Sequence, residues 1–497
     1  MKKYKGEILI VLGCILIIGI TITFAYFLAN IEGEGKSITL KSKNLKITFT
    51  ESNNLSGENI SPGWSKTSTF TVKNEVDKDY TYNIVIKDLI NTFVTTGNLQ
   101  YKVTSTDGGY NMADFKDIPK SNAKSNKPIG KNITISGNTT QTYTVLFTYK
   151  NSEDNQAEDM GKILSGQIII DEFINTTLAE EILEDNPTIS TRYDFSIPFT
   201  TNTPNTLYKS TENEVTVYYF AGQDTASTSI NNWVKFGEFY WRIIRTNSDG
   251  SIRLLYFGTN LDVTEGQIGT SAFNTNNVDS SKYAGYMYGD DDSTLDGIRA
   301  NTNDSTIKTY IDNWYENNLT AYTNYLSNDA IYCNDREIDS RYLYSNLSTA
   351  LFYFKSYERL LTNKMPTYDC KNNKDAFSVN NSEAKLKYSI SLMTADEVVY
   401  AGGIYGQRAP MWFLSDSSYN IIDLKNVWWV LSPVNRSESG VTIWYVGVSN
   451  LPGGLYSDYI FNIHSVRPVV SLKSCVLWKS GDGSASSPYE IVENGGC

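Results

Sequence analysis

The chain has 497 residues, too many for one ordinary domain, and 40% of them are hydrophobic and 13% aromatic. That composition is ample for folded cores and excludes a wholly disordered chain. The formal net charge of −12 argues against nucleic acid as a partner, because nucleic-acid binding needs a basic surface.

The N-terminal segment predicts a membrane anchor. Three lysines within the first five residues precede the range 8–28, which has no charged side chain and is long enough to span a bilayer. The lysines should keep residues 1–7 in the cytoplasm, which places the bulk of the chain outside the cell. A cleaved signal peptide is the alternative, although the end of the apolar run is a poor cleavage site. Cys14 is interpreted as an apolar filler rather than a lipidation site.

Residues 35–171 contain short strand-like runs separated by turn residues. Spacing of this kind predicts a β-sandwich or a jelly roll. Ala25-Tyr26-Phe27, Ser61-Pro62-Gly63 and Val72-Lys73-Asn74 resemble the camelysin-type biofilm-matrix and spore-coat-associated proteins. The resemblance implies the fold and a surface location. Camelysins are described as metalloproteases, but this segment contains no His, so the protease activity is not carried over.

Residues 172–214 are expected to hold a short helix and a linker. Thr177 and Glu180 fit a capping box at the start of the helix, and Pro187 follows its end. The rest of the segment is rich in Thr, Asn, Ser and Pro, which is typical of a linker.

The range 215–475 opens with a hairpin and continues with two helices. The hairpin turns at Asn247-Ser248-Asp249-Gly250, with Gly where a positive φ is needed. The first helix, 306–319, follows Asp304-Ser305 as its cap and has apolar residues at helical spacing. The second helix, 395–401, has Thr394 and Glu397 as a capping box and Gly402 as its stop.

Three strands, 427–431, 441–448 and 466–472, end this range. Alternation along the second strand puts Trp444 and Tyr445 on opposite faces, so Tyr445 is exposed if Trp444 is core. Pro468 lacks an N–H, which favours a strand start.

The motif Trp428-Trp429-x-x-Ser432-Pro433, the aromatic strand, and Val466-Arg467-Pro468-Val469 resemble bacterial C-type-lectin-like domains. These domains share their fold with formylglycine-generating enzymes and with variable ligand-binding proteins of bacteria and phages. The resemblance implies an α+β head over 215–475 that binds a ligand more often than it catalyses. The expected fold class is therefore mainly β, with an N-terminal transmembrane helix, a β-sandwich and this head.

Four cysteines lie outside the expected anchor: Cys333, Cys370, Cys475 and Cys497. An even count in a translocated chain predicts disulfides. Of the three pairings we expect Cys333–Cys370 and Cys475–Cys497, because each pair lies within one local segment. The second bridge would tether the tail 476–497. Free thiols in a reducing habitat are the alternative, and the cysteine spacing argues against a zinc site.

Catalytic chemistry finds little support in the sequence. Formylglycine-generating enzymes use a neighbouring pair of reactive cysteines, and the stretch that resembles their core has none. A Ser-His-Asp triad would need His464, which no Gly-x-Ser-x-Gly elbow accompanies. A lone His of this kind is more often a surface or packed ring.

An acidic loop is the weak candidate for a metal site. Asp290, Asp291, Asp292 and Asp296 offer oxygen ligands of the kind that calcium prefers, and C-type lectins often use calcium. The spacing does not follow an EF-hand, so a solvated loop is the preferred interpretation and no cofactor is expected. The sugar-binding signatures Glu-Pro-Asn and Gln-Pro-Asp are both absent.

In this fold, ligands are met by the loops and strand faces between the Trp-Trp strand and the closing strand. Candidate ligand-binding residues there are Arg436, Glu438, Tyr445, Tyr456, Asp458 and Tyr459. The alternative is that these tyrosines only cover the local core. We therefore expect a membrane-anchored extracellular bacterial surface protein whose head binds or adheres to an extracellular protein or glycan. A structural biofilm-matrix or fibre component is the alternative, and an enzyme of the formylglycine-generating fold is a third.

Overall fold

The computed structural model describes residues 30–497 apart from 32–37, 42–44, 51–52, 56–59, 153–155, 172–175, 198, 200–205, 223–224, 226–229, 262–265, 277–279, 408–411, 415–426, 448–451 and 493–496. The expected anchor, residues 8–28, and the segment 1–7 lie outside the described residues. Within the part that is described, no helix is long and apolar enough to cross a membrane. The chain divides into two compact units, Met1–Asn175 and Thr176–Cys497.

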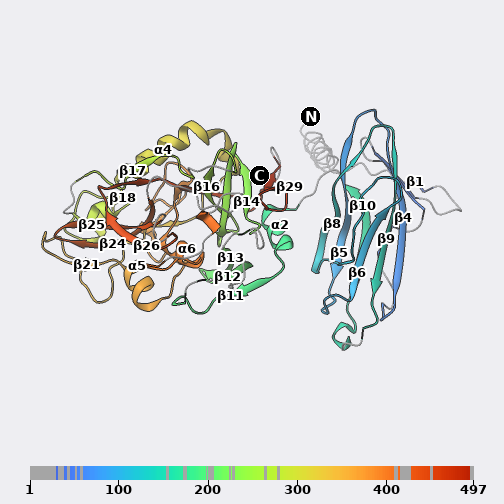
Figure 1. The fold of residues 1–497 in the computed structure, drawn as a ribbon, viewed down its shortest axis with the longest axis horizontal. Helices are drawn as coiled ribbons and strands as arrows, with labels where there is room; N and C mark the ends of the chain where they lie inside the picture. Colours follow the sequence, from blue (N-terminus) through green and yellow to red (C-terminus); the bar gives the residue numbers. More distant parts are fainter. Residues whose placement is uncertain are drawn as a thin grey trace, which may run out of the picture. The chain divides into compact units, whose positions relative to one another are not determined.

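Two antiparallel sheets make up the described part of the first unit (Figure 1). One has the strand order β1 (Asn30–Ile31), β2 (Ile38–Lys41), β3 (Leu45–Phe49), β4 (Ser65–Asn74), β9 (Thr140–Tyr149), β6 (Leu99–Ser105) and β7 (Lys116–Asp117). The other has the order β10 (Leu164–Asp171), β5 (Tyr80–Asn91) and β8 (Ser121–Ile135). A 3-10 turn, η1 (Ala157–Asp159), precedes β10.

Both sheets contribute to one hydrophobic core. Burial alternates along β3 and β9, as expected when every second side chain points inward. Phe70 of β4 stacks on Tyr143 of β9, and the Tyr82 hydroxyl from β5 donates to the Tyr143 hydroxyl at 2.7 Å. This bond joins the two sheets inside the core, since β5 and β9 belong to different sheets.

The second unit contains two larger sheets and two small ribbons over its described residues. The largest sheet runs β11 (Ile189–Thr191), β12 (Thr206–Glu212), β13 (Val215–Ala221), β15 (Phe239–Thr246), β14 (Trp233–Phe236), β30 (Tyr489–Ile491) and β29 (Trp478–Ser480). It continues from β15 through β16 (Ile252–Gly258) and β28 (Pro468–Leu472) to β23 (Ile390–Leu392).

The second large sheet runs β17 (Thr270–Ala272), β27 (Ile463–Ser465), β24 (Trp428–Ser437), β25 (Gly440–Val446) and β26 (Leu455–Tyr459), with β21 (Phe352–Tyr353) paired to β24. The ribbons are β18 (Met287–Tyr288) with β19 (Asn303–Asp304), and β20 (Tyr332–Cys333) with β22 (Ala376–Phe377). The prediction of a mainly β chain is thus confirmed.

The helices of the second unit are short. They are α2 (Leu178–Asp185), α3 (Leu295–Ile298), α4 (Thr306–Asn318), α5 (Lys355–Tyr357) and α6 (Ala395–Tyr400). The 3-10 turns are η2 (Ser281–Ala284), η3 (Thr320–Tyr325), η5 (Asn373–Asp375) and η6 (Trp412–Leu414), and η4 (Glu358–Asn363) is a π turn.

Local helix signals are confirmed. Thr177 with Glu180 forms a complete capping box ahead of α2, and Thr394 with Glu397 forms one ahead of α6. Ser305 caps α4 by accepting from the backbone N–H of Lys308. These bonds satisfy backbone donors that a helix cannot pair internally.

The expected hairpin and strand start are also found. The turn between β15 and β16 closes with the N–H of Asn247 donating to the carbonyl of Ser251 at 2.8 Å, and Gly250 has a φ of +79°. An added Cβ at Gly250 would also meet the Ser474 side chain at 3.0 Å, so two constraints favour Gly. Strand β28 begins at Pro468, as the missing N–H predicts.

Two segments have a larger part in the fold than the sequence indicated. In the expected linker 172–214, β12 pairs with β13 along its whole length, from Thr206↔Ala221 to Glu212↔Val215. In the expected tail 476–497, β30 pairs in parallel with β14 on one side and antiparallel with β29 on the other. Backbone hydrogen bonds therefore make both segments parts of the second unit, which begins at Thr176 rather than at 215.

The second unit buries many aromatic side chains. Among its described residues, the fully buried tryptophans are Trp233, Trp241, Trp412, Trp428, Trp429 and Trp444. Trp444 is buried, but Ile443, on the opposite face of β25, is buried as well. Tyr445 is half-buried, so it is less exposed than simple alternation predicts.

Candidate functional site

The six candidate ligand-binding residues do not share one surface. Arg436 is only 1% exposed, and its Nη1 donates to the carbonyls of Ala350, at 2.6 Å, and Leu347. The expectation that Arg436 contacts a ligand is therefore wrong, because its guanidinium holds a loop of the same chain. Glu438 is exposed, but it lies at the turn between β24 and β25. Tyr459 stacks on Phe461 with ring centroids 5.5 Å apart.

Three of the six residues, Tyr445, Tyr456 and Asp458, do lie together on one face of β25 and β26. The register pairs Tyr445 with Tyr456 and Ile443 with Asp458. The Tyr445 and Tyr456 rings are stacked, with centroids 5.6 Å apart and planes inclined by 26°. Tyr459 is three positions from Tyr456 and points to the opposite face.

A residue that the sequence did not assign to this face completes it. The Nε2 of His464, on β27, lies 2.8 Å from Oδ2 of Asp458. The His464 ring packs 4.3 Å from the buried Trp429 ring and 5.3 Å from the Tyr445 ring. Its only sequence signal was that it is the one His of the chain, beside strands rich in aromatic residues.

The environment of His464 determines its protonation state and its tautomer. Burial lowers the pKa of His464, and this effect outweighs the opposing hydrogen bond and charge of Asp458. The imidazole is therefore neutral at physiological pH. Because a carboxylate only accepts, the proton lies on Nε2 and is donated to Asp458.

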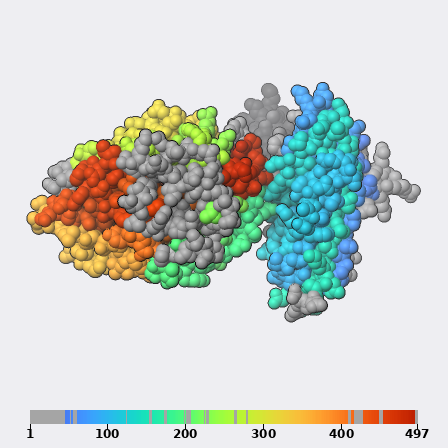
Figure 2. All heavy atoms as spheres, in the orientation of Figure 1, coloured from blue at the N-terminus to red at the C-terminus, as the bar shows by residue number. Residues whose placement is uncertain are grey.

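Tyr405 lies at the edge of the sheet, paired with Leu455 of β26, and its ring is near those of both Tyr456 and the buried Trp444. It is 46% exposed, and its ring centroid lies 6.4 Å from that of Tyr456. We call Tyr405, Tyr445, Tyr456, Asp458 and His464 the tyrosine–histidine face. Ser457 of β26 is exposed nearby, and Figure 2 shows orange to red segments from the C-terminal part of the chain at the surface of the second unit. The face can stack on flat or apolar groups and form hydrogen bonds at its His–Asp edge.

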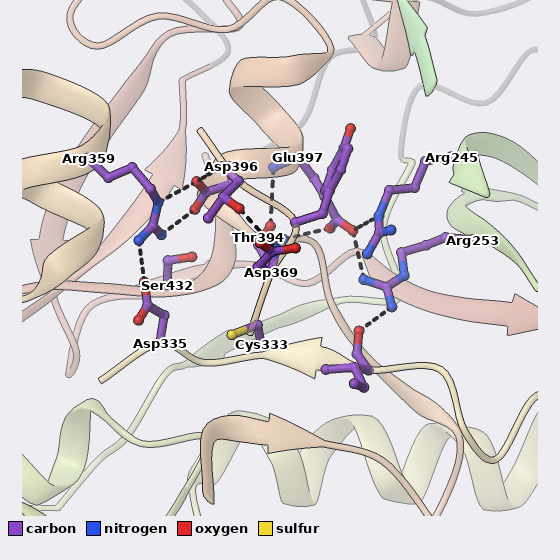
Figure 3. Close-up of a pocket in the computed structure, with 13 residues that line it drawn as sticks. Arg245, Arg253, Cys333, Asp335, Arg359, Asp369, Thr394, Asp396, Glu397 and Ser432 are labelled. Carbon is purple, nitrogen blue, oxygen red and sulfur yellow. Dashed lines mark hydrogen bonds and ion pairs between the residues drawn. The ribbon is translucent and has the colours of Figure 1, made fainter. Parts of the chain in front are cut away.

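A second concentration of polar groups lies inside the unit, at the start of α6 (Figure 3). Glu397 Oε1 is 2.9 Å from Arg245 Nε and 2.7 Å from Arg253 Nη1. Arg245 also pairs with Glu212 at 2.9 Å. All four side chains are at most 4% exposed. Burial disfavours the charged carboxyl, but the two arginines outweigh it and hold the pKa of Glu397 below its ordinary value.

The other side of this cluster is built around Arg359. Its Nε lies 2.7 Å from Asp396 Oδ1, and its Nη1 lies 2.7 Å from Asp335 Oδ2. Burial raises the pKa of Asp335, against the opposing charge of Arg359. The cavity between the charged groups is about 20 Å³, room for about one water molecule. The cluster therefore holds parts of the fold together and does not accommodate a substrate.

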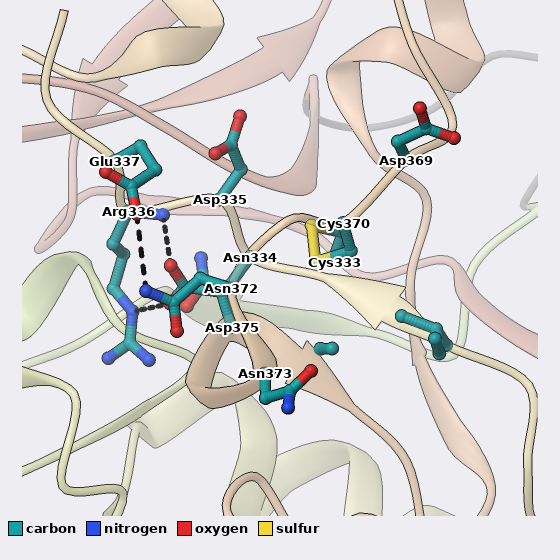
Figure 4. Close-up of a disulfide and its surroundings, with 12 residues drawn as sticks. Cys333, Asn334, Asp335, Arg336, Glu337, Asp369, Cys370, Asn372, Asn373 and Asp375 are labelled. Atoms are coloured by element: carbon teal, nitrogen blue, oxygen red, sulfur yellow. Dashed lines mark hydrogen bonds and ion pairs between the residues drawn. A yellow bond between two sulfur atoms is a disulfide. The ribbon is translucent and has the colours of Figure 1, made fainter. Parts of the chain in front are cut away.

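Both expected disulfides are present. Cys333, at the end of β20, bonds to Cys370, and Cys475 bonds to Cys497. Figure 4 shows the Cys333–Cys370 bond beside Asp335 and the Arg336–Asp375 pair. The first bridge thus joins the segment ahead of η5 to β20 and lies next to the buried ion pairs.

Removing the Cys333–Cys370 bridge should destabilise the second unit markedly. The bonded residues are 37 apart in sequence, and the double variant Cys333→Ser/Cys370→Ser should lose about 3–4 kcal/mol of unfolding free energy in the chain-entropy model. Urea unfolding under oxidising conditions measures the loss. Replacing Cys475 and Cys497, 22 residues apart, should cost a similar amount. Unchanged unfolding in the first variant, or free thiols at these positions in the native protein, would contradict the assignment.

The acidic loop does not form a metal site among the described residues, where no group of three acidic, His or Cys side chains is arranged to hold an ion. Its carboxylates have separate partners. Asp291 accepts from Ser293, Asp292 from Ser280 and Asp290 from Asn303. Asp296 pairs with Lys374 at 3.2 Å. The calcium hypothesis therefore gains no support from the geometry of Asp290, Asp291, Asp292 and Asp296.

Neither a family model nor a curated protein matches this sequence. Among solved structures, the sporulation control protein Spo0M from Bacillus subtilis aligns at 12% identity with a TM-score of 0.12. The alignment covers 43% of this chain and 79% of that protein. Similarity at this level establishes neither a shared fold nor a shared function.

Proposed function

We propose that this chain is a membrane-anchored extracellular protein of a bacterial surface. In this proposal its second unit is a C-type-lectin-like head that binds a protein or glycan ligand without catalysis. The observation that carries the proposal is the tyrosine–histidine face. Four of its five residues, Tyr445, Tyr456, Asp458 and His464, come from the segment between the Trp428-Trp429 strand and the closing strand, where the resemblance expects a ligand.

The chemistry of the face suits recognition. A tyrosine ring offers a large, rigid contact area at a low cost in conformational entropy, and the Tyr445 and Tyr456 rings are already stacked on each other. Asp458 is fixed by His464 and by the amide of Asn462, which donates to Oδ1 at 2.7 Å. A ligand would therefore meet a preorganised surface.

The two disulfides support the extracellular part of the proposal. Stable disulfides are typical of oxidising compartments and rare in the cytosol. The apolar segment 8–28 supplies the proposed attachment to the membrane. The resemblance of the first unit to camelysin-type proteins also favours a surface location.

Truncating the paired tyrosines should reduce ligand capture. Tyr445→Ala and Tyr456→Ala each remove a half-buried ring from the face, so capture should fall about tenfold or more, the loss typical of a central interface tyrosine. The measurement uses cells that display the full chain, incubated with an array of glycans and purified extracellular proteins. The melting temperature of each purified variant shows whether the head remains folded.

Tyr459→Ala is the matched control, because its ring lies on the opposite face of β26 and stacks on Phe461. It should leave capture unchanged. Equal capture by all variants would show that the ligand binds at another surface of the protein. Polymerisation of the purified chain without any ligand would instead favour the matrix or fibre function.

A further inference from the structure

A hollow of about 420 Å³ opens at one end of the largest sheet. Its walls come from β14 and the turn after it, from η3, and from β29 and β30. Its volume lies in the range of about 300–1,000 Å³ that is usual for small-molecule sites. Figure 1 draws β14 and β29 at the other end of the second unit from β25, so the hollow is separate from the tyrosine–histidine face. We call it the Lys–Glu pocket, and six of its lining residues carry polar groups: Lys235, Glu238, Tyr322, Tyr325, Lys479 and Glu490.

The turn between β14 and β15 forms part of the rim of this pocket. Gly237 has a φ of +60° and Glu238 a φ of +68°, and two successive positive φ values are typical of the tight turns that join hairpin strands. An added Cβ at Gly237 would meet Leu319 Cδ2 at 3.1 Å and the Tyr322 ring at 3.4 Å. The turn is therefore packed closely against the chain that follows α4, which fixes the backbone of the exposed Glu238 at the rim.

Two tyrosines of η3 give the pocket an aromatic wall. The buried Phe236 ring meets the Tyr322 ring edge to face at 5.5 Å and the Tyr325 ring edge to face at 6.0 Å. Both tyrosines are half-buried, so part of each ring remains accessible, while the contacts with Phe236 hold the rings in place before a ligand arrives. A sugar ring has a face of C–H groups, and covering that face with an aromatic ring removes apolar surface from water.

The charged groups that line the pocket balance one another. Lys479 Nζ lies 3.0 Å from Glu490 Oε2. The hydrogen bond from Lys479 lowers the pKa of Glu490 against the opposing effect of burial, and the charges of Lys479 and Lys235 lower it further, so both ammonium groups act on one carboxylate. Glu238 adds a second carboxylate at the rim. Two lysines and two glutamates therefore cancel in charge, while the lysines offer only donors and the carboxylates only acceptors.

We propose that the Lys–Glu pocket binds a short stretch of an uncharged glycan. A sugar hydroxyl both donates and accepts, so neighbouring hydroxyls can donate to Glu490 and accept from Lys235 or Lys479. An anionic ligand would instead meet two carboxylates, and a cationic ligand would meet two ammonium groups. The half-buried rings of Tyr322 and Tyr325 cover the apolar face of the sugar. The tyrosine–histidine face belongs to the other large sheet, so the two proposals stand independently.

The test measures binding of defined sugars to the full chain, purified in a detergent whose head group is not a sugar. Saturation-transfer NMR uses neutral trimers of N-acetylglucosamine, glucose and galactose, and charged trimers of glucosamine and galacturonate. At least one neutral trimer should bind at millimolar concentration. Both charged trimers should bind about tenfold or more weakly than that neutral trimer, because each brings a charge against a like charge in the pocket.

Two variants locate the binding site. Glu490→Gln and Lys235→Met should each weaken binding of that trimer about tenfold, because each removes a charged hydrogen-bonding group from the pocket. Glu316→Gln is the matched control, since Glu316 pairs with Lys387 at 3.5 Å on an exposed surface away from the pocket lining. Urea unfolding shows that each variant remains folded.

Tyr445→Ala separates this site from the tyrosine–histidine face, and it should leave binding of the trimer unchanged. Loss of binding in Tyr445→Ala would overturn the proposal and assign the sugar to that face. No binding by any neutral trimer, full binding by both pocket variants, or tighter binding of a charged trimer would also overturn it.

Discussion

Replacing Glu397 with Gln is expected to lower the unfolding free energy of the second unit by about 3–5 kcal/mol, the usual cost of breaking a buried ion pair. The carboxylate accepts from both Arg245 and Arg253, and all three side chains are at most 3% exposed. Without it, two buried guanidinium groups lose their shared counter-charge. Urea unfolding followed by tryptophan fluorescence measures this loss, because all nine tryptophans except Trp64 lie in the second unit.

Glu316→Gln is the matched control for the same chemical change. Glu316 forms an exposed pair with Lys387 at 3.5 Å, and surface pairs of this kind contribute little to stability. Its unfolding curve should overlay that of the parent chain. If Glu397→Gln behaved like this control, the buried cluster would have no special part in holding the fold.

The effect of Glu397→Gln should also depend on pH. The two arginines hold the folded-state pKa of Glu397 below its ordinary value of 4.5, despite the opposing effect of burial. A carboxyl with a lowered folded pKa stabilises the fold above the unfolded pKa and loses this contribution as the pH falls through the folded pKa. The difference between the parent and the variant should therefore stay constant from neutral pH to about 4.5 and narrow in more acidic solution.

The parts of the fold that the sequence predicted are those encoded by neighbouring residues. The capping boxes need only a hydroxyl and a carboxylate three positions apart, as at Thr394 and Glu397. The disulfides were found because each pair closes a short segment. Strand runs and the turn at Gly250 follow from side-chain period and backbone freedom.

The parts that were missed depend on contacts between distant segments. Arginine is common at binding surfaces, so the sequence favoured a ligand contact for Arg436. The carbonyls that accept its hydrogen bonds belong to a loop more than eighty residues earlier in the chain. The parallel pairing of Val234 with Tyr489 brings the C-terminal segment into the main sheet. His464 packs on Trp429, thirty-five residues earlier, because β27 pairs with β24. No periodicity within a segment reports such pairings, because closing the intervening chain is a property of the whole fold.

Arg336→Met is expected to be at least as damaging as the change at Glu397, with a loss near the upper end of the range of about 3–5 kcal/mol. The Arg336 side chain is fully buried and pairs with Asp375, whose Oδ1 lies 2.6 Å from Nε. Its Nη1 donates to the carbonyl of Met287 at 2.8 Å, and its Nη2 donates to that of Lys374 at 3.0 Å. Methionine fills a similar volume but leaves these acceptors unsatisfied in the interior.

A second substitution separates the lost charge pair from the lost carbonyl bonds. In Arg336→Met/Asp375→Asn the buried carboxylate is also neutralised, so the two losses should fall short of additivity by roughly 1–3 kcal/mol. The recovery stays incomplete because Asp375 also pairs with Arg299 at 3.0 Å, and the change to Asn removes the charge from that pair too. Lys374→Met removes a partly exposed charge from the same segment, whose partner Asp296 is 78% exposed, and it should leave the unfolding curve unchanged. Strict additivity in the double variant would show that Arg336 stabilises the fold through the carbonyls alone, and not through its pairing with Asp375.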